Sequence, residues 1–289
     1  MPRSPLEDLA RDCVPGLGPL EIYPLGAGLV NESYRVVRDG REFSLRVAAN
    51  ESGELGVDRR WECRVLEAAV AADLAPTIER CDPERGVLVA AWMPGRSLSP
   101  TEIRQPEGID TMADLLRRVH ALPIADPARV MSPAAWIAHY RGALQRRGAV
   151  APRAEAMLPD AHKRLALLAE SPYAPVVCHS DLHRLNVLIG VRAILLDWEY
   201  AHVSDPLWDL AGWAANNDWG IQAAARLLAS YLGRAPDRAE HVLLQSFIWL
   251  YDYVCLWWSE LYLRQEPCAG SAAVMHRVET LGRRLMRRR

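Results

Sequence analysis

Three polar side chains past the middle of the chain, Asp181, Asn186 and Asp197, have the types and the order that phosphoryl transfer requires. One carboxylate can orient an attacking hydroxyl, because this reaction asks the protein mainly for placement and electrostatic stabilisation. An Asn amide oxygen and a second carboxylate are hard oxygen ligands of the kind that Mg²⁺ prefers. We therefore expect Asp181 to be catalytic, and Asn186 and Asp197 to bind magnesium.

The spacing of these residues supports that interpretation. Residues 179–186 read His-x-Asp-x4-Asn, the spacing of the catalytic loop in protein kinases. Two short apolar runs, 187–189 and 193–196, predict a hairpin that brings Asn186 close to Asp197. A single Asp in a loop is commonly a helix cap or a turn residue, but three such residues in register favour catalysis.

Supporting residues surround this motif. We expect His179 to hold the loop through backbone hydrogen bonds rather than to act as an acid or base. His183 lies within the loop, and it either approaches the phosphate or substrate or faces solvent. Asp209, near a helix start, is expected to be a buried carboxylate that braces the loop backbone.

A nucleotide site is predicted upstream. Glycines between two strands let backbone N–H groups approach phosphate oxygens, although a plain turn would explain them equally well. Arg46 suits phosphate recognition because its guanidinium fork stays charged, and Glu62 on the next helix is its expected ion-pair partner. The alternative for Arg46 is a surface position. The residues expected at the ATP site are Gly26, Gly28, Asn31, Arg46, Glu62, Trp92 and Met93.

Alternating and helical hydrophobic patterns predict two lobes. Strands are expected at Leu20–Pro24, Ser33–Val37, Phe43–Val47, Thr77–Cys81 and Gly86–Ala91, with a helix at Val57–Asp73. Helices are expected at Thr101–Ala121, Pro133–Arg147 and Glu155–Glu170, and again from Pro206 onward. This predicts an α+β chain with a β-rich nucleotide-binding lobe (1–91), a hinge (92–95) and a mainly helical catalytic lobe (96–289).

Composition limits the class of protein. A formal net charge of −2 over 289 residues argues against nucleic-acid binding, and we expect the C-terminal arginines to be a solvated helix end. The six cysteines show no zinc-binding spacing, so reduced thiols and a cytoplasmic location are expected. The N-terminus shows no signal-peptide pattern, and the apolar run at 247–263 is interrupted by charges, so no membrane span is predicted.

Taken together, these motifs resemble the aminoglycoside phosphotransferase and choline kinase superfamily, over nearly the whole chain. The resemblance implies a bilobal fold like that of protein kinases. The bacterial thiamine kinase and choline kinase branch looks most similar, because Arg46 stands where protein kinases have Lys and Asp197-Trp198-Glu199 replaces Asp-Phe-Gly. A protein substrate is disfavoured, because the chain lacks a long activation segment.

The resemblance also suggests where the alcohol substrate binds. Aromatic faces attract weakly hydrated cations, although aromatic residues on a helix usually pack in the core. We expect the acceptor site to include Trp198, Glu199, Asn216, Trp249, Tyr253 and Trp257. Asn216 replaces a Glu that choline kinases tend to have, which weakens a choline cage.

The prediction is thus an ATP- and Mg²⁺-dependent kinase that phosphorylates the primary hydroxyl of a small cationic alcohol. Thiamine is favoured, and choline or ethanolamine is the alternative. An aminoglycoside or sugar kinase fits less well, as does a non-catalytic binding protein of the same fold. The sequence leaves the oligomeric state open.

Overall fold

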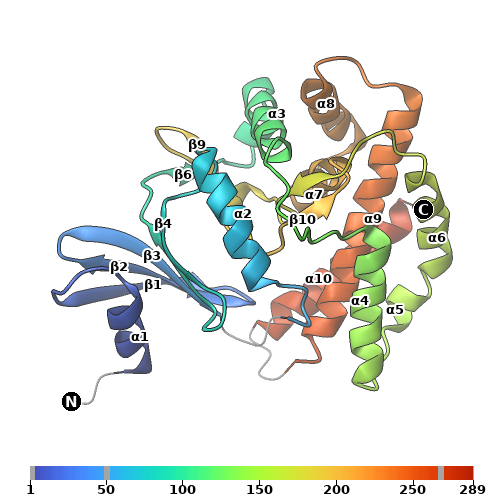
Figure 1. Ribbon diagram of the computed structural model, residues 1–289. Coiled ribbons are helices and arrows are strands. Elements are labelled where there is room, and N and C mark those ends of the chain that lie inside the picture. The colour runs from blue at the N-terminus through green and yellow to red at the C-terminus, as the bar shows by residue number, and fades with distance from the viewer. Residues whose placement is uncertain (1–3, 49–52, 266–269, 289) are drawn as a thin grey trace.

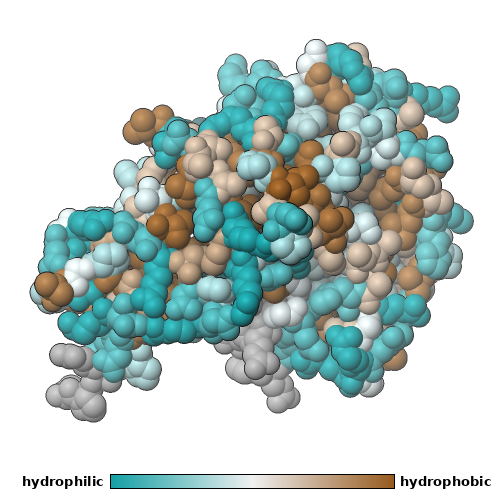
Figure 2. Space-filling model, viewed as in Figure 1, coloured by the Kyte–Doolittle hydropathy of each residue, from teal (hydrophilic) through white to brown (hydrophobic). Residues whose placement is uncertain are grey.

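The computed structural model describes residues 4–48, 53–265 and 270–288. Strands gather at one end of the molecule and helices at the other (Figure 1). This arrangement confirms the predicted α+β, kinase-like fold. Hydrophilic residues cover most of the face shown in Figure 2, and hydrophobic residues form small separate patches there.

The N-terminal sheet has five antiparallel strands in the order β1-β2-β3-β5-β4. Its strands are β1 (Leu20–Ala27), β2 (Asn31–Arg38), β3 (Arg41–Ala48), β4 (Ile78–Asp82) and β5 (Val87–Ala91). Asp39 and Gly40, between β2 and β3, both have positive φ, as a tight two-residue hairpin turn requires. The predicted inserted helix is α2 (Arg59–Ala71), which packs against β4.

Helix α1 (Pro5–Cys13) precedes the sheet and was not predicted. Its sequence does carry a start signal, because Ser4 and Glu7 form a reciprocal capping box and Pro5 occupies the first turn. Buried residues of α1 join a small core formed with β2, β3 and β5. The N-terminal region therefore has its own apolar core, separate from the larger one beneath α2.

Helices dominate the remainder of the chain. They are α3 (Pro106–His120), α4 (Pro133–Arg146), α5 (Pro152–Glu155), α6 (Leu158–Leu168), α7 (Leu207–Asn216), α8 (Ile221–Leu232), α9 (Arg238–Tyr262) and α10 (Ser271–Arg287), with 3₁₀ turns η1 (Glu102–Arg104) and η2 (Arg184–Asn186). Helix α9 is buried along most of its length and packs against α4, α6, α7 and α10. It is the central element against which the other helices are placed.

Five short strands position the predicted catalytic motif. β7 (Val176–Cys178) pairs with β10 (His202–Ser204), while β6 (Arg96–Ser97), β8 (Val187–Ile189) and β9 (Ala193–Leu195) form a three-stranded sheet. The predicted β8–β9 hairpin is therefore confirmed. A Cβ on Gly190 would lie 2.6 Å from the carbonyl oxygen of Pro94, so the segment between β5 and β6 packs closely on this hairpin.

Two sequence expectations about charged and thiol groups are wrong. Cys63 on α2 and Cys81 on β4 form a disulfide, with their Cα atoms 5.9 Å apart, so not all cysteines are reduced. Arg284 in α10 and Arg288, which follows the helix, turn inward and form ion pairs with the buried carboxylate of Asp252 instead of facing solvent. The expectation of no membrane span agrees with the described helices, since none is long and apolar enough to cross a bilayer.

Candidate active site

Asp209 on α7 binds the backbone of the loop that follows β7. This carboxylate accepts hydrogen bonds from the backbone N–H groups of His179 (2.8 Å) and Ser180 (2.7 Å), and it also contacts Nε2 of His120 at 3.3 Å. Burial raises the pKa of Asp209, but His120 and the backbone donors outweigh burial and lower it. Asp209 therefore stays charged and fixes the loop, at the position where a bracing carboxylate was predicted.

His179 joins this loop to the segment after β9 that carries Asp197. Its Nε2 lies 2.9 Å from the carbonyl oxygen of Leu196, and its Nδ1 accepts the N–H of Asp181 at 3.3 Å. The ring packs at 4.7 Å from the indole of Trp198. Both ring nitrogens are thus used within the protein, as expected of a residue that holds the loop.

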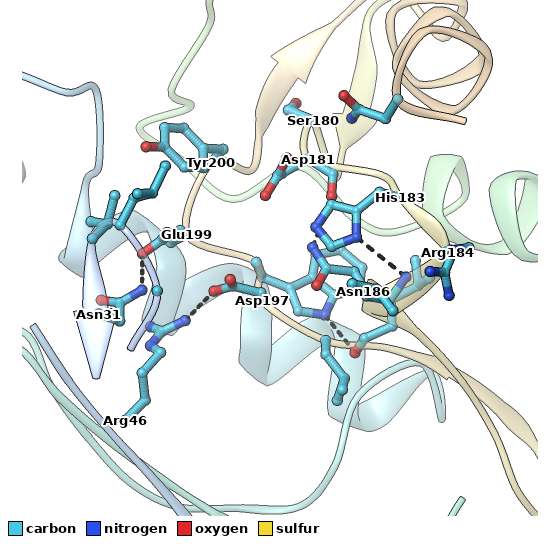
Figure 3. A pocket seen from close by; sticks show the side chains of 18 of the residues that line it. Asn31, Arg46, Ser180, Asp181, His183, Arg184, Asn186, Asp197, Glu199 and Tyr200 are labelled. Carbon is cyan, nitrogen blue, oxygen red and sulfur yellow. Dashed lines mark hydrogen bonds and ion pairs between the residues drawn. The ribbon is translucent and has the colours of Figure 1, made fainter. Parts of the chain in front are cut away.

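The hairpin β8–β9 brings Asn186 and Asp197 to the same end of a small sheet, near Asp181 (Figure 3). The Asn186 amide donates to the carbonyl oxygen of Asp181 at 2.9 Å, which orients the side chain and leaves its oxygen without a hydrogen bond among the described residues. Ser180 and Asp197 both have positive φ, at 71° and 64°. Such backbone conformations cost free energy in non-glycine residues and gather at functional sites.

A pair of arginines faces these acidic groups from the N-terminal side. Arg46 on β3 forms ion pairs with Glu62 on α2 and, at 2.6 Å, with Asp197. The Arg46–Glu62 pair therefore exists as predicted. Burial lowers the pKa of Arg46, but the carboxylates around it outweigh that effect and hold the pKa above its usual range.

Arg59 forms an ion pair with Glu199, as Arg46 does with Asp197. Its Nη1 lies 2.8 Å from Glu199, and Asn31 donates to the same carboxylate oxygen at 2.8 Å. Burial and the neighbouring Asp197 raise the pKa of Glu199 to about 7. Because both Arg59 and Asn31 already bind it, Glu199 is occupied within the protein and is not a free partner for a cationic substrate.

A cavity of about 1080 Å³ lies between the sheet and the helices. Predicted residues on its wall are Gly28, Asn31, Arg46, Trp92, Met93, Asp181, Asn186, Asp197, Trp198, Glu199 and Asn216. Gly26 and Glu62 lie outside this wall, and Glu62 acts on it only through its pairing with Arg46. Burial raises the pKa of Asp181 and lowers that of His183, which also lines the cavity.

Three predicted substrate contacts are wrong. Trp249, Tyr253 and Trp257 are at most 1% exposed, and none lines the cavity. The Trp249 indole donates to the carbonyl oxygen of Leu285, and the Tyr253 hydroxyl donates to that of Ala154. Their shared stripe on α9 faces the helical core, so these rings stabilise the fold instead of binding ligand.

Other cavity residues were missed by the sequence analysis. Tyr251, on the face of α9 opposite the predicted stripe, lines the cavity and donates to the carbonyl oxygen of Ser180 at 3.1 Å. Arg277 on α10 also lines the cavity. Arg59 lies at the N-terminus of α2, three positions before Glu62, a spacing that could have signalled an ion pair. Arg277 belongs to no motif, and its only signal is the helical stripe that α10 turns toward the cavity.

A β-rich lobe and a helical lobe, with a cavity between them lined by Asp181, Asn186 and Asp197, have the arrangement of a kinase-like phosphotransferase. The model of the family described as "Phosphotransferase enzyme family" (APH) matches residues 21–242. The chain therefore belongs to this family.

Relatives and solved structures agree with that placement. The chain is 26% identical over 216 residues to a probable choline kinase of Arabidopsis thaliana, a match that covers 69% of this chain and 60% of the relative. Choline kinase LicA of Streptococcus pneumoniae has a TM-score of 0.79 at 20% identity and covers 98% of each chain. A choline/ethanolamine kinase family protein of Mesorhizobium loti has a TM-score of 0.76 at 22% identity, with 97% and 94% covered. At these identities the two solved structures show a shared fold.

Proposed function

We propose that this protein is an ATP- and Mg²⁺-dependent kinase that transfers a phosphoryl group to the hydroxyl of a small alcohol. The observation that carries the proposal is the convergence of Asp181, Asn186 and Asp197 on one wall of the cavity, opposite Arg46 (Figure 3). Family membership supports phosphotransfer, and the complex of LicA with AMP supports an adenine nucleotide.

The donor set suits magnesium. Asn186 offers an amide oxygen and Asp197 offers a carboxylate oxygen that is not used by Arg46, and both are hard ligands. Mg²⁺ bound there would neutralise charge on the transferred phosphoryl group, which is what a metal supplies to this reaction. Arg46 would bind phosphate oxygens beside it, because its position is already fixed by Glu62.

Asp181 would orient the attacking hydroxyl and accept its proton. It lies in a loop whose backbone is fixed by Asp209 and His179, so its carboxylate is held in place before substrate binds. The raised pKa caused by burial makes Asp181 a better proton acceptor than an exposed carboxylate. Trp198 and the helical wall formed by α9 and α10 shield this region from water.

The identity of the alcohol is a finer question. Choline and ethanolamine are candidate acceptors, because similar proteins are named choline kinase and ethanolamine kinase. Thiamine is the cationic alcohol that the sequence favours. Three of the aromatic residues behind that preference lie in the core, and Glu199 is bound by Arg59. Most of the groups expected to bind a cation are therefore already engaged within the protein.

A coupled assay of ADP release tests the proposal. Purified protein with ATP and Mg²⁺ would be screened against thiamine, choline, ethanolamine, amino sugars, aminoglycosides and hydroxy acids, and a phosphorylated product would be confirmed by mass spectrometry. Turnover that is lost on removal of Mg²⁺ and lost in Asp181→Asn is the expected result. Nucleotide binding without turnover of any alcohol would favour a binding protein of the same fold and contradict the proposal.

A further inference from the structure

Arg277 is a cation on the acceptor wall that no carboxylate of the described residues neutralises. It projects from α10 into the cavity, where Ala273, His276 and Thr280 of the same helix also line the wall. Within 4 Å its guanidinium forms no ion pair with an Asp or Glu of residues 4–48, 53–265 or 270–288. By contrast, Arg46 and Arg284, which also line the cavity, each form an ion pair with a carboxylate.

The surroundings of Arg277 are aromatic and neutral. Its guanidinium lies over the indole of Trp258, 5.6 Å from the ring centroid. The Trp258 N–H donates to the hydroxyl of Tyr200 at 2.9 Å, which fixes the ring in place beneath the cation. Cys255 and Tyr251 of α9 are its other close neighbours, and neither carries a charge at neutral pH.

Arg277 also lies near the catalytic carboxylate. Asp181 raises the pKa of Arg277, and Arg277 in turn lowers the pKa of Asp181. Burial lowers the pKa of Arg277, but its neighbours, Asp181 among them, outweigh burial and hold the pKa above its usual range, so the guanidinium stays charged. A free positive charge thus faces the space in which a hydroxyl would meet Asp181.

Apart from Asp181, the carboxylates on or beneath the cavity wall that could balance a cationic substrate are already paired with arginines. Asp197 and Glu199 are bound by Arg46 and Arg59, and Asp252 is bound beneath the wall by α10. Asn216 is neutral, and its amide donates to the carbonyl oxygen of Leu182 and to the Tyr251 hydroxyl. A quaternary ammonium would also find the cavity-facing ring of Trp258 already covered by a guanidinium.

We infer that the acceptor alcohol carries an anionic group, such as a carboxylate or phosphate, and that Arg277 is the residue that binds it. A guanidinium recognises such groups through two parallel hydrogen bonds, which would fix the distance between the acid group and the hydroxyl at Asp181. This inference rests on the proposed kinase function, and it replaces the cationic alcohol of the sequence analysis by a hydroxy acid or phosphorylated alcohol.

Three compounds of similar size and different charge test the inference: glycerate, glycerol and 2-amino-1,3-propanediol. Binding of each to the protein saturated with Mg²⁺ and ADP would be measured by calorimetry, and phosphorylation of each by ADP release. We expect glycerate to bind best. Arg277→Gln should weaken glycerate binding by about 30-fold, the effect of a lost charge-assisted hydrogen-bond pair, and leave the affinity for ATP unchanged. Arg277→Glu should shift the preference toward the amine.

Arg283→Gln is the matched control, because Arg283 lies on the same helix but is exposed. Equal or tighter binding of the amine or of glycerol to the wild type would overturn the inference, as would the failure of glycerate to bind. A loss of ATP affinity in Arg277→Gln would overturn it too, since the guanidinium would then serve the nucleotide. The kinase proposal would stand in each of these cases if another alcohol is phosphorylated in an Asp181-dependent manner.

Discussion

The two sides of the cavity differ in whether their arginines are paired with carboxylates. On the N-terminal side, Arg46 and Arg59 are locked to Glu62, Asp197 and Glu199. On the helical side, Arg277 has no carboxylate partner among the described residues. A paired cation is held in position before any ligand arrives, whereas an unpaired cation on a cavity wall favours an anion. Under the proposed function, the paired side would bind the nucleotide in a preorganised site and the unpaired side would select the acceptor.

Asp181 lies where the two sides meet, and its loss should give the largest effect. Asp181→Asn keeps the size of the side chain but cannot accept the hydroxyl proton, so kcat should fall by about 10³-fold. The melting temperature should stay close to that of the wild type, because Asp181 forms no ion pair among the described residues. Asp114→Asn on the exposed face of α3 is the control. Activity retained in Asp181→Asn would remove the catalytic assignment.

Breaking an ion pair on the N-terminal side of the cavity should lower both the stability and the activity of the protein. Glu62 is 1% exposed, so Arg46→Gln leaves a buried carboxylate with less compensation. We expect the free energy of unfolding to fall by about 3 kcal/mol, the lower end for such a change, because Arg59 still contacts Glu62. The affinity for ATP should fall with it.

Chemical denaturation of matched variants checks this difference between the two sides. Arg60→Gln on α2 breaks an exposed pair with Glu84 and should cost under about 1 kcal/mol. Arg277→Gln should be similarly mild, because no partner is left behind. If Arg277→Gln destabilises the protein as much as Arg46→Gln does, the contrast between paired and unpaired cations is not valid.

His202 is neither paired with a carboxylate nor left as an unpaired charge, because it is buried in its neutral form. It lies next to the loop that carries Asp181. Its Nδ1 lies 2.9 Å from the Ser180 hydroxyl, and burial lowers its pKa to about 4. A lowered folded-state pKa contributes stability that is complete above the unfolded value of about 6.5 and is lost as the pH falls toward 4. Between about pH 7.5 and 5 the free energy of unfolding should therefore drop by about 2 kcal/mol from this group.

Denaturation of His202→Gln across the same pH range measures that contribution. The variant should start less stable at neutral pH and show a flatter dependence on pH. His162→Gln, at an exposed position of α6, should keep the wild-type slope. An unchanged slope in His202→Gln would show that His202 does not titrate on unfolding.

How much the sequence could predict also differs between the two sides. Asp181, Asn186 and Asp197 lie within 17 residues, so local spacing and one hairpin were enough to place them together. Arg46 and Glu62 follow from a strand and the next helix. The acceptor wall depends on how α9 and α10 rotate about their axes. A helical stripe states which residues share a face, but only tertiary packing decides whether that face meets the core or the cavity.

The stripe on α9 shows this limit directly. Trp249, Tyr253 and Trp257 share one face and were assigned to the substrate, yet that face meets the core. Tyr251 and Trp258 lie on the opposite face and line the cavity. Arg277 follows a segment outside the described residues, and no motif fixes its register. The face of α9 on which an aromatic residue lies therefore separates a structural role from a role at the site.

The smallest predicted effect comes from comparing two tyrosines that lie on opposite faces of α9. The Tyr251 hydroxyl donates to the carbonyl oxygen of Ser180 and accepts the amide of Asn216, so it ties the acceptor wall to the catalytic loop. Tyr251→Phe should cost about 1 kcal/mol of stability, the net value of a buried hydrogen bond, and lower kcat several-fold because Asp181 is held less firmly.

Tyr253→Phe is a matched control, because its hydroxyl is also buried and donates to a backbone carbonyl, that of Ala154, away from the cavity. It should lose a similar amount of stability and keep full activity. Steady-state kinetics and thermal denaturation of both variants would separate the two roles. A fall in kcat for Tyr253→Phe equal to that for Tyr251→Phe would mean that general loosening of α9, rather than a specific link to the loop, lowers the activity.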